Sequence, residues 1–131
     1  MSNTPENPAP RILIVDDDWM NRELLSTILT ADNFLVLEAA RGEKALSMAQ
    51  THIPDLILLD VRMPDMNGYA VCRQLKSNAA TAPIPVIMIT GLEEDSERQR
   101  ALDAGAVNIV NRFLSMSELT AMIRAYLAPR N

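Results

Sequence analysis

Arg-Ile-Leu-Ile-Val-Asp-Asp-Asp, residues 11–18, is an apolar run that ends in three acidic residues. A second apolar run, Leu-Ile-Leu-Leu-Asp at 56–60, has the same form and ends in Asp60. Apolar runs of this length without alternation predict strands that are buried on both faces, as in a parallel sheet covered by helices. Ligands of such sheets bind at the carboxyl ends of the strands. We therefore expect both strands to deliver their carboxylates to one edge of a sheet.

These carboxylates would form a compact cluster if the two strands are neighbours. Asp16, Asp17 and Asp60 would then repel one another unless a cation lies among them. Carboxylate oxygens are the ligands that Mg2+ prefers, so the pattern predicts a Mg2+ site. Taken alone, the acidic run is equally typical of a solvated loop or a helix N-cap, and Asp18 fits the N-cap.

The composition is that of a single globular domain. The chain has 131 residues, 48% of them hydrophobic, and a net charge of -5, which argues against nonspecific nucleic-acid binding by this domain. A single cysteine, Cys72, allows no disulfide framework, and a reducing compartment such as the cytoplasm is the natural location. Residues 1–10 contain three prolines and no apolar stretch, so we expect a disordered lead and neither a signal peptide nor a membrane span.

Strand patterns alternate with helical patterns along the rest of the chain. The predicted strands cover residues 11–15, 34–37, 55–59, 86–89 and 106–110, and a helical pattern follows each of them. Gly105 is a good helix C-cap, and Ser115 with Glu118 forms a capping box for the last helix. Five such units with short right-handed crossovers predict an α/β domain with a doubly wound, parallel, five-stranded sheet over residues 11–128.

Three segments together resemble the receiver domain of two-component response regulators. They are Ile-Leu-Ile-Val-Asp-Asp-Asp at 12–18, Leu-Leu-Asp-Val-Arg-Met-Pro-Asp-Met-Asn-Gly at 58–68 and Ile-Met-Ile-Thr-Gly at 87–91. The resemblance extends over about 11–127 and implies a flavodoxin-like fold with the sheet order 2-1-3-4-5. It also implies that the chain is no enzyme in its own right but takes a phosphoryl group from a histidine kinase or a phosphotransfer protein.

The same resemblance assigns roles to individual residues. Asp60 would be the phosphoacceptor, and Asp16, Asp17, Asp60 and the carbonyl of Arg62 would hold Mg2+. Thr90 would bond the phosphoryl group. Such a site lowers the barrier to phosphoryl transfer mainly by neutralising charge on the equatorial oxygens.

The chain departs from the family near its end. Arg112 and Phe113 stand where the family has a lysine followed by a proline, and Ile109 replaces an aromatic switch residue. Arginine presents a planar guanidinium with several donors, whereas lysine presents a compact point charge. If the alignment with the family is shifted by one residue, Asn111 takes the lysine position instead of Arg112. A cis peptide bond before Phe113 would cost about 2.5 to 4 kcal/mol, against about 0.5 to 1 kcal/mol before proline.

Three functions are compatible with these residues. The first is a phosphoaccepting receiver whose last strand and helix pass the signal on and can form a homodimer. The second is a receiver-like module that binds partner proteins without phosphorylation, as Arg112, Phe113 and Ile109 would favour. The third is a phosphatase of the haloacid-dehalogenase type, because Asp16 and Asp18 fit its Asp-x-Asp motif, although a chain of this length leaves no room for a cap.

Overall fold

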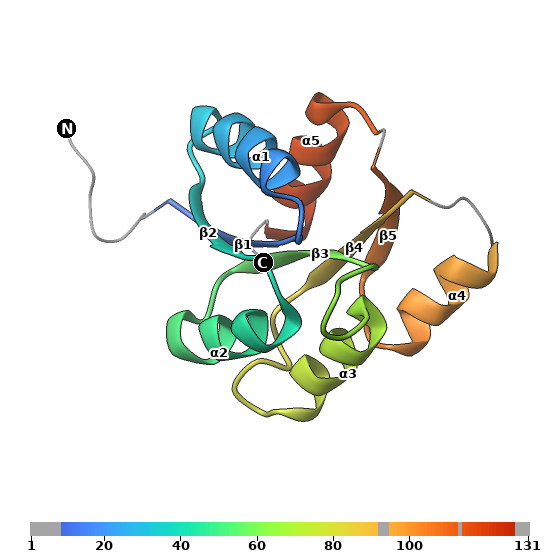
Figure 1. The fold of residues 1–131 in the computed structure, drawn as a ribbon. Coiled ribbons are helices and arrows are strands. Elements are labelled where there is room, and N and C mark those ends of the chain that lie inside the picture. Colours follow the sequence, from blue (N-terminus) through green and yellow to red (C-terminus); the bar gives the residue numbers. More distant parts are fainter. Residues whose placement is uncertain (1–8, 92–94, 113, 128–131) are drawn as a thin grey trace.

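The computed structural model describes residues 9–91, 95–112 and 114–127. Most of the expected N-terminal lead, and Phe113, therefore lie outside the described residues. Strands and helices alternate strictly along the chain (Figure 1). The elements are β1 Arg11–Val15, α1 Trp19–Ala31, β2 Leu35–Ala39, α2 Gly42–His52, β3 Leu56–Asp60, α3 Gly68–Ser77, β4 Val86–Thr90, α4 Asp95–Asp103, β5 Asn108–Asn111 and α5 Met116–Leu127.

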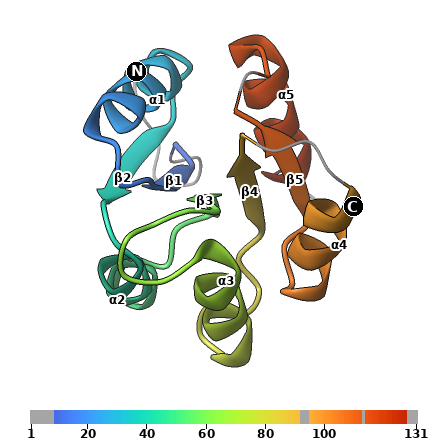
Figure 2. The same ribbon diagram turned by 45° about the vertical axis from the view of Figure 1, so that its right-hand side comes forward.

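The strands form one parallel sheet in the order β2-β1-β3-β4-β5, which confirms the expected doubly wound fold. Helices α1 and α5 cover one face, and α2, α3 and α4 cover the other (Figure 1, Figure 2). Both faces of the central strand β3 are therefore shielded, and every one of its residues is buried. This double burial explains the absence of polar alternation in the strand sequences. None of the described helices is long and apolar enough to span a membrane.

Several helix ends follow the local signals in the sequence. Asp18 caps α1, because its Oδ1 accepts a hydrogen bond of 3.0 Å from the backbone N–H of Met20. The capping box before α5 is formed, since the N–H of Glu118 donates to Ser115 Oγ at 3.2 Å. Gly105 has a φ of +103°, the left-handed conformation that suits a residue after a helix.

Three strands begin later than the sequence pattern predicts: β3 starts one residue late, at Leu56, and the late starts of β2 and β5 follow from hydrogen bonds at the preceding helix ends. Strand β2 begins at Leu35 because the N–H of Phe34 donates to the carbonyl of Leu29 at 3.0 Å and so still belongs to the end of α1. Strand β5 begins after the N–H of Ala106 has donated to the carbonyl of Ala101, also at 3.0 Å. Phe34 and Ala106 are buried in the core although they belong to the ends of the preceding helices. The apolar pattern of the sequence does not distinguish such residues from the first residues of a strand.

Candidate functional site

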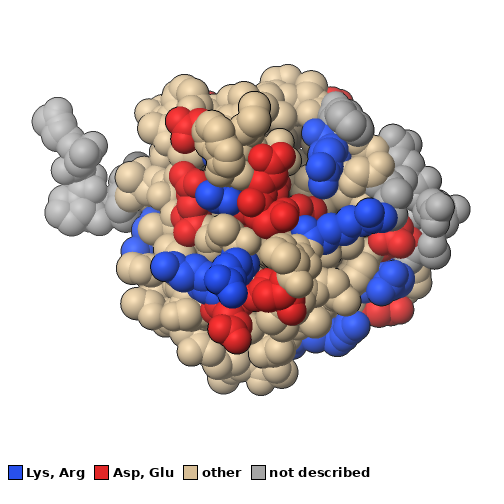
Figure 3. All heavy atoms as spheres, viewed as in Figure 1, with Lys and Arg blue, Asp and Glu red and all other residues tan. Residues whose placement is uncertain are grey.

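The carboxyl ends of β1 and β3 bring three acidic side chains together. Val15 pairs with Leu59 across these neighbouring strands, so the next residues, Asp16 and Asp60, lie side by side. Asp16, Asp17 and Asp60 each offer a carboxylate oxygen, and these oxygens lie within 4.8 Å of one another. Figure 3 shows acidic side chains gathered near the middle of this face of the molecule, with basic side chains close by. The donor set of three clustered carboxylates fits a hard divalent cation such as Mg2+.

Asp18 does not join this group. Its carboxylate caps α1, and the acidic group found among the described residues contains only Asp16, Asp17 and Asp60. Asp18 therefore acts as a helix cap, and its carboxylate is not part of the three-residue cluster.

Burial makes the cluster electrostatically unfavourable without a cation. Asp60 is only 4% exposed, and its burial, followed by the charge of Asp16, raises the pKa of its carboxyl to about 6. Burial also raises the pKa of Asp16, although a 2.9 Å hydrogen bond from the N–H of Asp18 opposes the shift. A bound divalent cation would remove this penalty by balancing the charge.

Arg22, which the sequence patterns do not single out, holds the β1–α1 loop. Its Nη1 donates to the carbonyl of Asp16 at 2.8 Å, and its Nε lies 3.2 Å from a carboxylate oxygen of Glu38. The side chain therefore joins the acidic loop to β2. No spacing in the sequence indicates this contact, because it depends on β2 lying beside β1.

Arg112, which follows β5, extends its side chain to the acidic cluster. Its Nη2 lies 3.5 Å from Asp60 Oδ1, and its backbone N–H donates to the carbonyl of Thr90 at 2.8 Å. Asn111, the preceding residue, pairs with Thr90 across strands β4 and β5. The register therefore places Arg112, and not Asn111, beside Asp60.

Thr90 and Gly91 lie at the end of β4, next to this arginine. Thr90 is 5% exposed and follows Ile89, the strand partner of Asp60. A Cβ atom on Gly91 would lie 3.5 Å from Arg112 Nε, so the space beside this glycine adjoins the guanidinium. The site therefore combines carboxylates, the Thr90 hydroxyl and the Arg112 guanidinium at the carboxyl edge of the sheet.

The loop 61–67, which follows Asp60, is held at both of its ends. The N–H of Arg62 donates to Asp60 Oδ1 at 3.2 Å. Asp65 accepts hydrogen bonds from the first N–H groups of α2, and these bonds lower the pKa of its carboxyl. The sequence gives no signal for this contact, because helix and loop are far apart along the chain.

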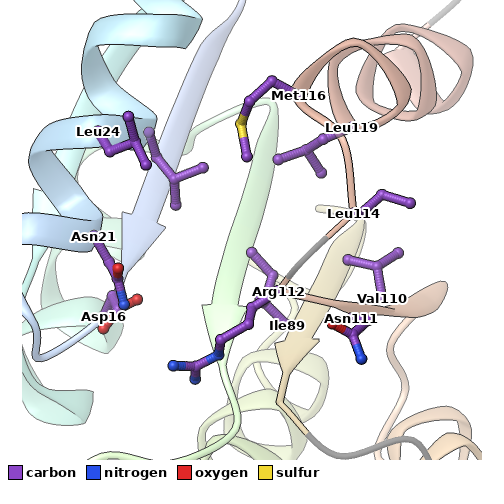
Figure 4. Close-up of a pocket in the computed structure, with 11 residues that line it drawn as sticks. Asp16, Asn21, Leu24, Ile89, Val110, Asn111, Arg112, Leu114, Met116 and Leu119 are labelled. Carbon is purple, nitrogen blue, oxygen red and sulfur yellow. The ribbon is translucent and has the colours of Figure 1, made fainter.

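An apolar pocket of about 250 Å³ lies between α1 and α5 beside the acids (Figure 4). Leu24 from α1 and Met116 and Leu119 from α5 point into it, while Asp16 and Arg112 lie at its polar end. The pocket adjoins the acidic cluster directly and supplies an apolar surface next to it.

Ile109 and Tyr69 lie on the other face of the sheet. Ile109 is 6% exposed and packs in the core, so no aromatic ring is available at this position to move between two orientations. On the same face, the hydroxyl of Tyr69 donates a hydrogen bond to Glu97 of α4. The guanidinium of Arg100 lies 4.3 Å from the centre of the Tyr69 ring. These contacts join the start of α3 to α4.

Comparison with known proteins gives one consistent result. The sequence pattern that defines the response regulator receiver domain matches residues 12–124. Response regulator PleD of Caulobacter vibrioides is 43% identical over 117 residues, which are 89% of this chain and 26% of that protein. The probable transcriptional regulator ycf27 of Porphyra purpurea is 39% identical over 93% of this chain and 49% of its own length. The chain thus spans between a quarter and a half of the length of these relatives.

Solved structures agree with the sequence comparisons. A response regulator from Chloroflexus aurantiacus superposes with a TM-score of 0.88 at 30% identity, covering 92% of this chain and 99% of that one. The signal receiver domain of a signal transduction histidine kinase from Syntrophus aciditrophicus gives a TM-score of 0.86 at 33% identity, covering 94% and 95%. Chemotaxis protein CheY4 of Vibrio cholerae gives 0.86 at 26% identity, covering 91% of this chain and 99% of its own.

Proposed function

Because this chain belongs to the family of response regulator receiver domains, a phosphoacceptor family of two-component signalling, we propose that Asp60 is its phosphoacceptor. The observation that carries the assignment is the position of Asp60 at the end of the central strand, within 4.8 Å of Asp16 and Asp17. An acyl phosphate can form only where a carboxylate oxygen is aligned with the phosphorus and the surrounding charge is neutralised.

The residues divide the chemistry among them. Asp16, Asp17, Asp60 and the carbonyl of Arg62 would hold Mg2+, which when bound neutralises charge on the phosphoryl oxygens. The Asp60 carboxylate attacks phosphorus, and the bond from phosphorus to the donor's leaving group breaks. The Thr90 hydroxyl donates a hydrogen bond to a phosphoryl oxygen.

The protonation state of Asp60 suits this role at neutral pH. Only the ionised carboxylate is a nucleophile, and a pKa of about 6 leaves most molecules ionised at pH 7 and above. Arg112, 3.5 Å away, can either contact the incoming phosphoryl group or remain on Asp60 and compete with it.

Membership of the family indicates the phosphoryl donor, the cellular compartment and the binding partners to propose for this chain. Receiver domains interact with histidine kinases or phosphotransfer proteins. We propose such a donor for this chain, in the cytoplasm, with no membrane or nucleic-acid contact by this domain. A homodimer through β5 and α5 is also proposed, since Leu102, Val107 and Tyr126 leave exposed apolar surface beside these elements.

Intact-mass measurement after incubation with acetyl phosphate and Mg2+ tests the phosphoacceptor. The wild-type protein should gain one phosphoryl group, and Asp60→Asn should gain none. Asp103→Asn, which removes a carboxylate at the end of α4, serves as the matched control and should gain the group normally. An adduct retained by Asp60→Asn would move the acceptor elsewhere.

The second candidate function is a module that binds partners without phosphorylation. The ion pair between Arg112 and Asp60 favours it, because a guanidinium already occupies one side of the acceptor. The same mass measurement separates the two functions, since such a module would gain no phosphoryl mass even as the wild type.

A further inference from the structure

Helix α2 obtains its N-terminal cap from a distant part of the chain. Its N-cap residue, Arg41, has an extended backbone and a side chain that makes no capping hydrogen bond. The first two N–H groups of the helix donate instead to the carboxylate of Asp65, Gly42 N to Oδ1 at 2.9 Å and Glu43 N to Oδ2 at 3.1 Å. Each carboxylate oxygen thus satisfies one N–H group that would otherwise lack a partner in the helix.

Met66 strengthens the attachment of the same loop. A Cβ atom on Gly42 would lie 2.3 Å from Met66 Cγ and 2.8 Å from its Sδ, so the methionine packs directly on the backbone of α2. At the end of the loop, Asn67 caps α3 by accepting a 2.9 Å hydrogen bond from the N–H of Ala70. The loop is therefore fastened to two helices.

Arg62 lies in this loop between Asp60 and the attachment to α2. Its N–H already donates to Asp60 at 3.2 Å, so the main chain at this residue runs beside the acidic cluster. The course of that main chain depends on where the rest of the loop is held. Asp65 is the one loop carboxylate that ties it to a helix, and both of its oxygens are engaged there.

We propose that Asp65 is a positioning residue for the metal site, because its carboxylate ties the loop to α2 and so fixes the main chain of Arg62 beside Asp60. The inference rests on the proposed function, since it concerns the same Mg2+ site. Without the tie, Mg2+ binding would have to order the loop, and the cost of that ordering would appear as weaker affinity.

Replacement of Asp65 tests the proposal through the affinity for Mg2+, followed by the fluorescence of Trp19, the only tryptophan. Asp65→Ala should raise the Kd for Mg2+ about tenfold, the lower end for loss of a residue that orients a metal ligand. Asp65→Asn has the same charge as the alanine variant but keeps one carbonyl oxygen for an N–H group of α2. Its Kd should fall between those of the wild type and Asp65→Ala, whereas a purely electrostatic effect would make the two variants equal.

A second replacement separates positioning from helix stability. Arg41→Ser places a capping side chain directly before α2, where the extended backbone suits it. In Arg41→Ser/Asp65→Ala the melting temperature should return toward that of Arg41→Ser alone, while the Kd for Mg2+ should stay about tenfold weaker than in Arg41→Ser. A Kd restored together with stability would overturn the proposal, as would an Asp65→Ala variant that binds Mg2+ like the wild type.

These outcomes are distinct from failure of the proposed function. A wild-type protein that binds Mg2+ but gains no phosphoryl mass would remove the phosphoacceptor assignment, and the Kd series would still decide the role of Asp65. A wild-type protein that binds no Mg2+ would overturn the metal site and the positioning role together.

Discussion

The guanidinium of Arg112 lies 3.5 Å from the carboxylate of Asp60, Nη2 to Oδ1, yet the pKa of Asp60 is still raised to about 6. Burial of the carboxylate and the charge of Asp16 therefore outweigh the attraction of the arginine. The side chain of Arg112 is 37% exposed, so water screens its half of the pair. The ion pair thus only partly compensates the negative charge of the acidic cluster, and a divalent cation would compensate more of it.

The raised pKa of Asp60 predicts how stability depends on pH. The folded protein binds this proton more tightly than the unfolded chain, whose carboxyl has an ordinary pKa of 3.8. The stabilisation is therefore complete below about pH 4 and is lost as the pH rises through about 6. Above pH 7, without Mg2+, Asp60→Asn should be more stable than the wild type by on the order of 3 kcal/mol.

Urea unfolding of both proteins between pH 4 and pH 8 measures this difference. The advantage of Asp60→Asn should grow across the window and shrink when Mg2+ is added. A difference that is the same at every pH would mean that Asp60 titrates normally in the folded protein.

Mg2+ binding should raise the melting temperature of the wild type. At 100 times the Kd a ligand stabilises the folded state by about 2.7 kcal/mol, which corresponds to roughly 10 °C for a domain of this size. Asp17→Asn should lose most of this rise, because Asp17 belongs to the acidic cluster. The measurement is a thermal melt with and without Mg2+.

Asp18→Asn is the matched control for that variant. It removes the same charge from the same acidic run, and asparagine keeps the N-cap that Asp18 provides for α1. We expect it to retain the rise. An Asp17→Asn protein that responded as fully as this control would rule out Asp17 as a ligand.

Tyr69→Phe tests the connection between α3 and α4. The change removes the hydroxyl that donates to Glu97 and should destabilise the protein by about 0.5 to 1.5 kcal/mol. Helix α4 has a polar sequence, and Ala101 is the one buried residue among its described side chains, so we expect the lost stability to appear mainly in α4. Amide hydrogen exchange should become faster in α4, while the Kd for Mg2+ stays unchanged.

Exchange in α4 that matched the wild type would show that this hydrogen bond does not hold the helix. A change of Mg2+ affinity would instead mean that the contact acts on the metal site.

The sheet and the acidic cluster were predictable because their signals are local and the topology is restrictive. Continuous apolar runs indicate buried parallel strands, and parallel strands place their carboxyl ends at one edge. The runs before Asp16 and Asp60 were therefore enough to expect the two carboxylates together. The cap at Asp18 and the capping box at Ser115 were also predictable, because each signal lies within one turn of the helix that it caps.

The contacts that hold the site in place carry no such signal. Asp65 caps a helix 23 residues earlier in the chain, and Arg22 joins the β1–α1 loop to Glu38 on the neighbouring strand. Both contacts depend on side-chain directions across elements that only the fold brings together. Sequence periodicity reports which face of an element is buried, and it does not report which polar group on a loop finds a distant backbone partner.

The last prediction concerns the replacement of the family's lysine and proline by Arg112 and Phe113. On the proposed function, a guanidinium held on Asp60 would compete with Mg2+ and with the incoming phosphoryl group, whereas the point charge of lysine would contact the phosphoryl group without bidentate geometry. Arg112→Lys combined with Phe113→Pro should accelerate phosphorylation by acetyl phosphate up to about fivefold, because a half-exposed ion pair contributes only about 0 to 1 kcal/mol. A time course of intact mass at fixed Mg2+ gives the rate, and dilution into chelator gives the lifetime of the adduct.

Two single changes assign the effect to its cause. Arg112→Lys alone changes the cation, and Phe113→Pro alone lowers the cost of a cis peptide bond at that position. Arg124→Lys, on α5 and paired with Asp32, is the matched control and should leave the rate unaltered. If the double variant and the wild type gave equal rates and lifetimes, Arg112 would have no part in phosphoryl transfer. If neither protein gained phosphoryl mass, the contact of Arg112 with Asp60 would instead favour the module that binds partners without phosphorylation.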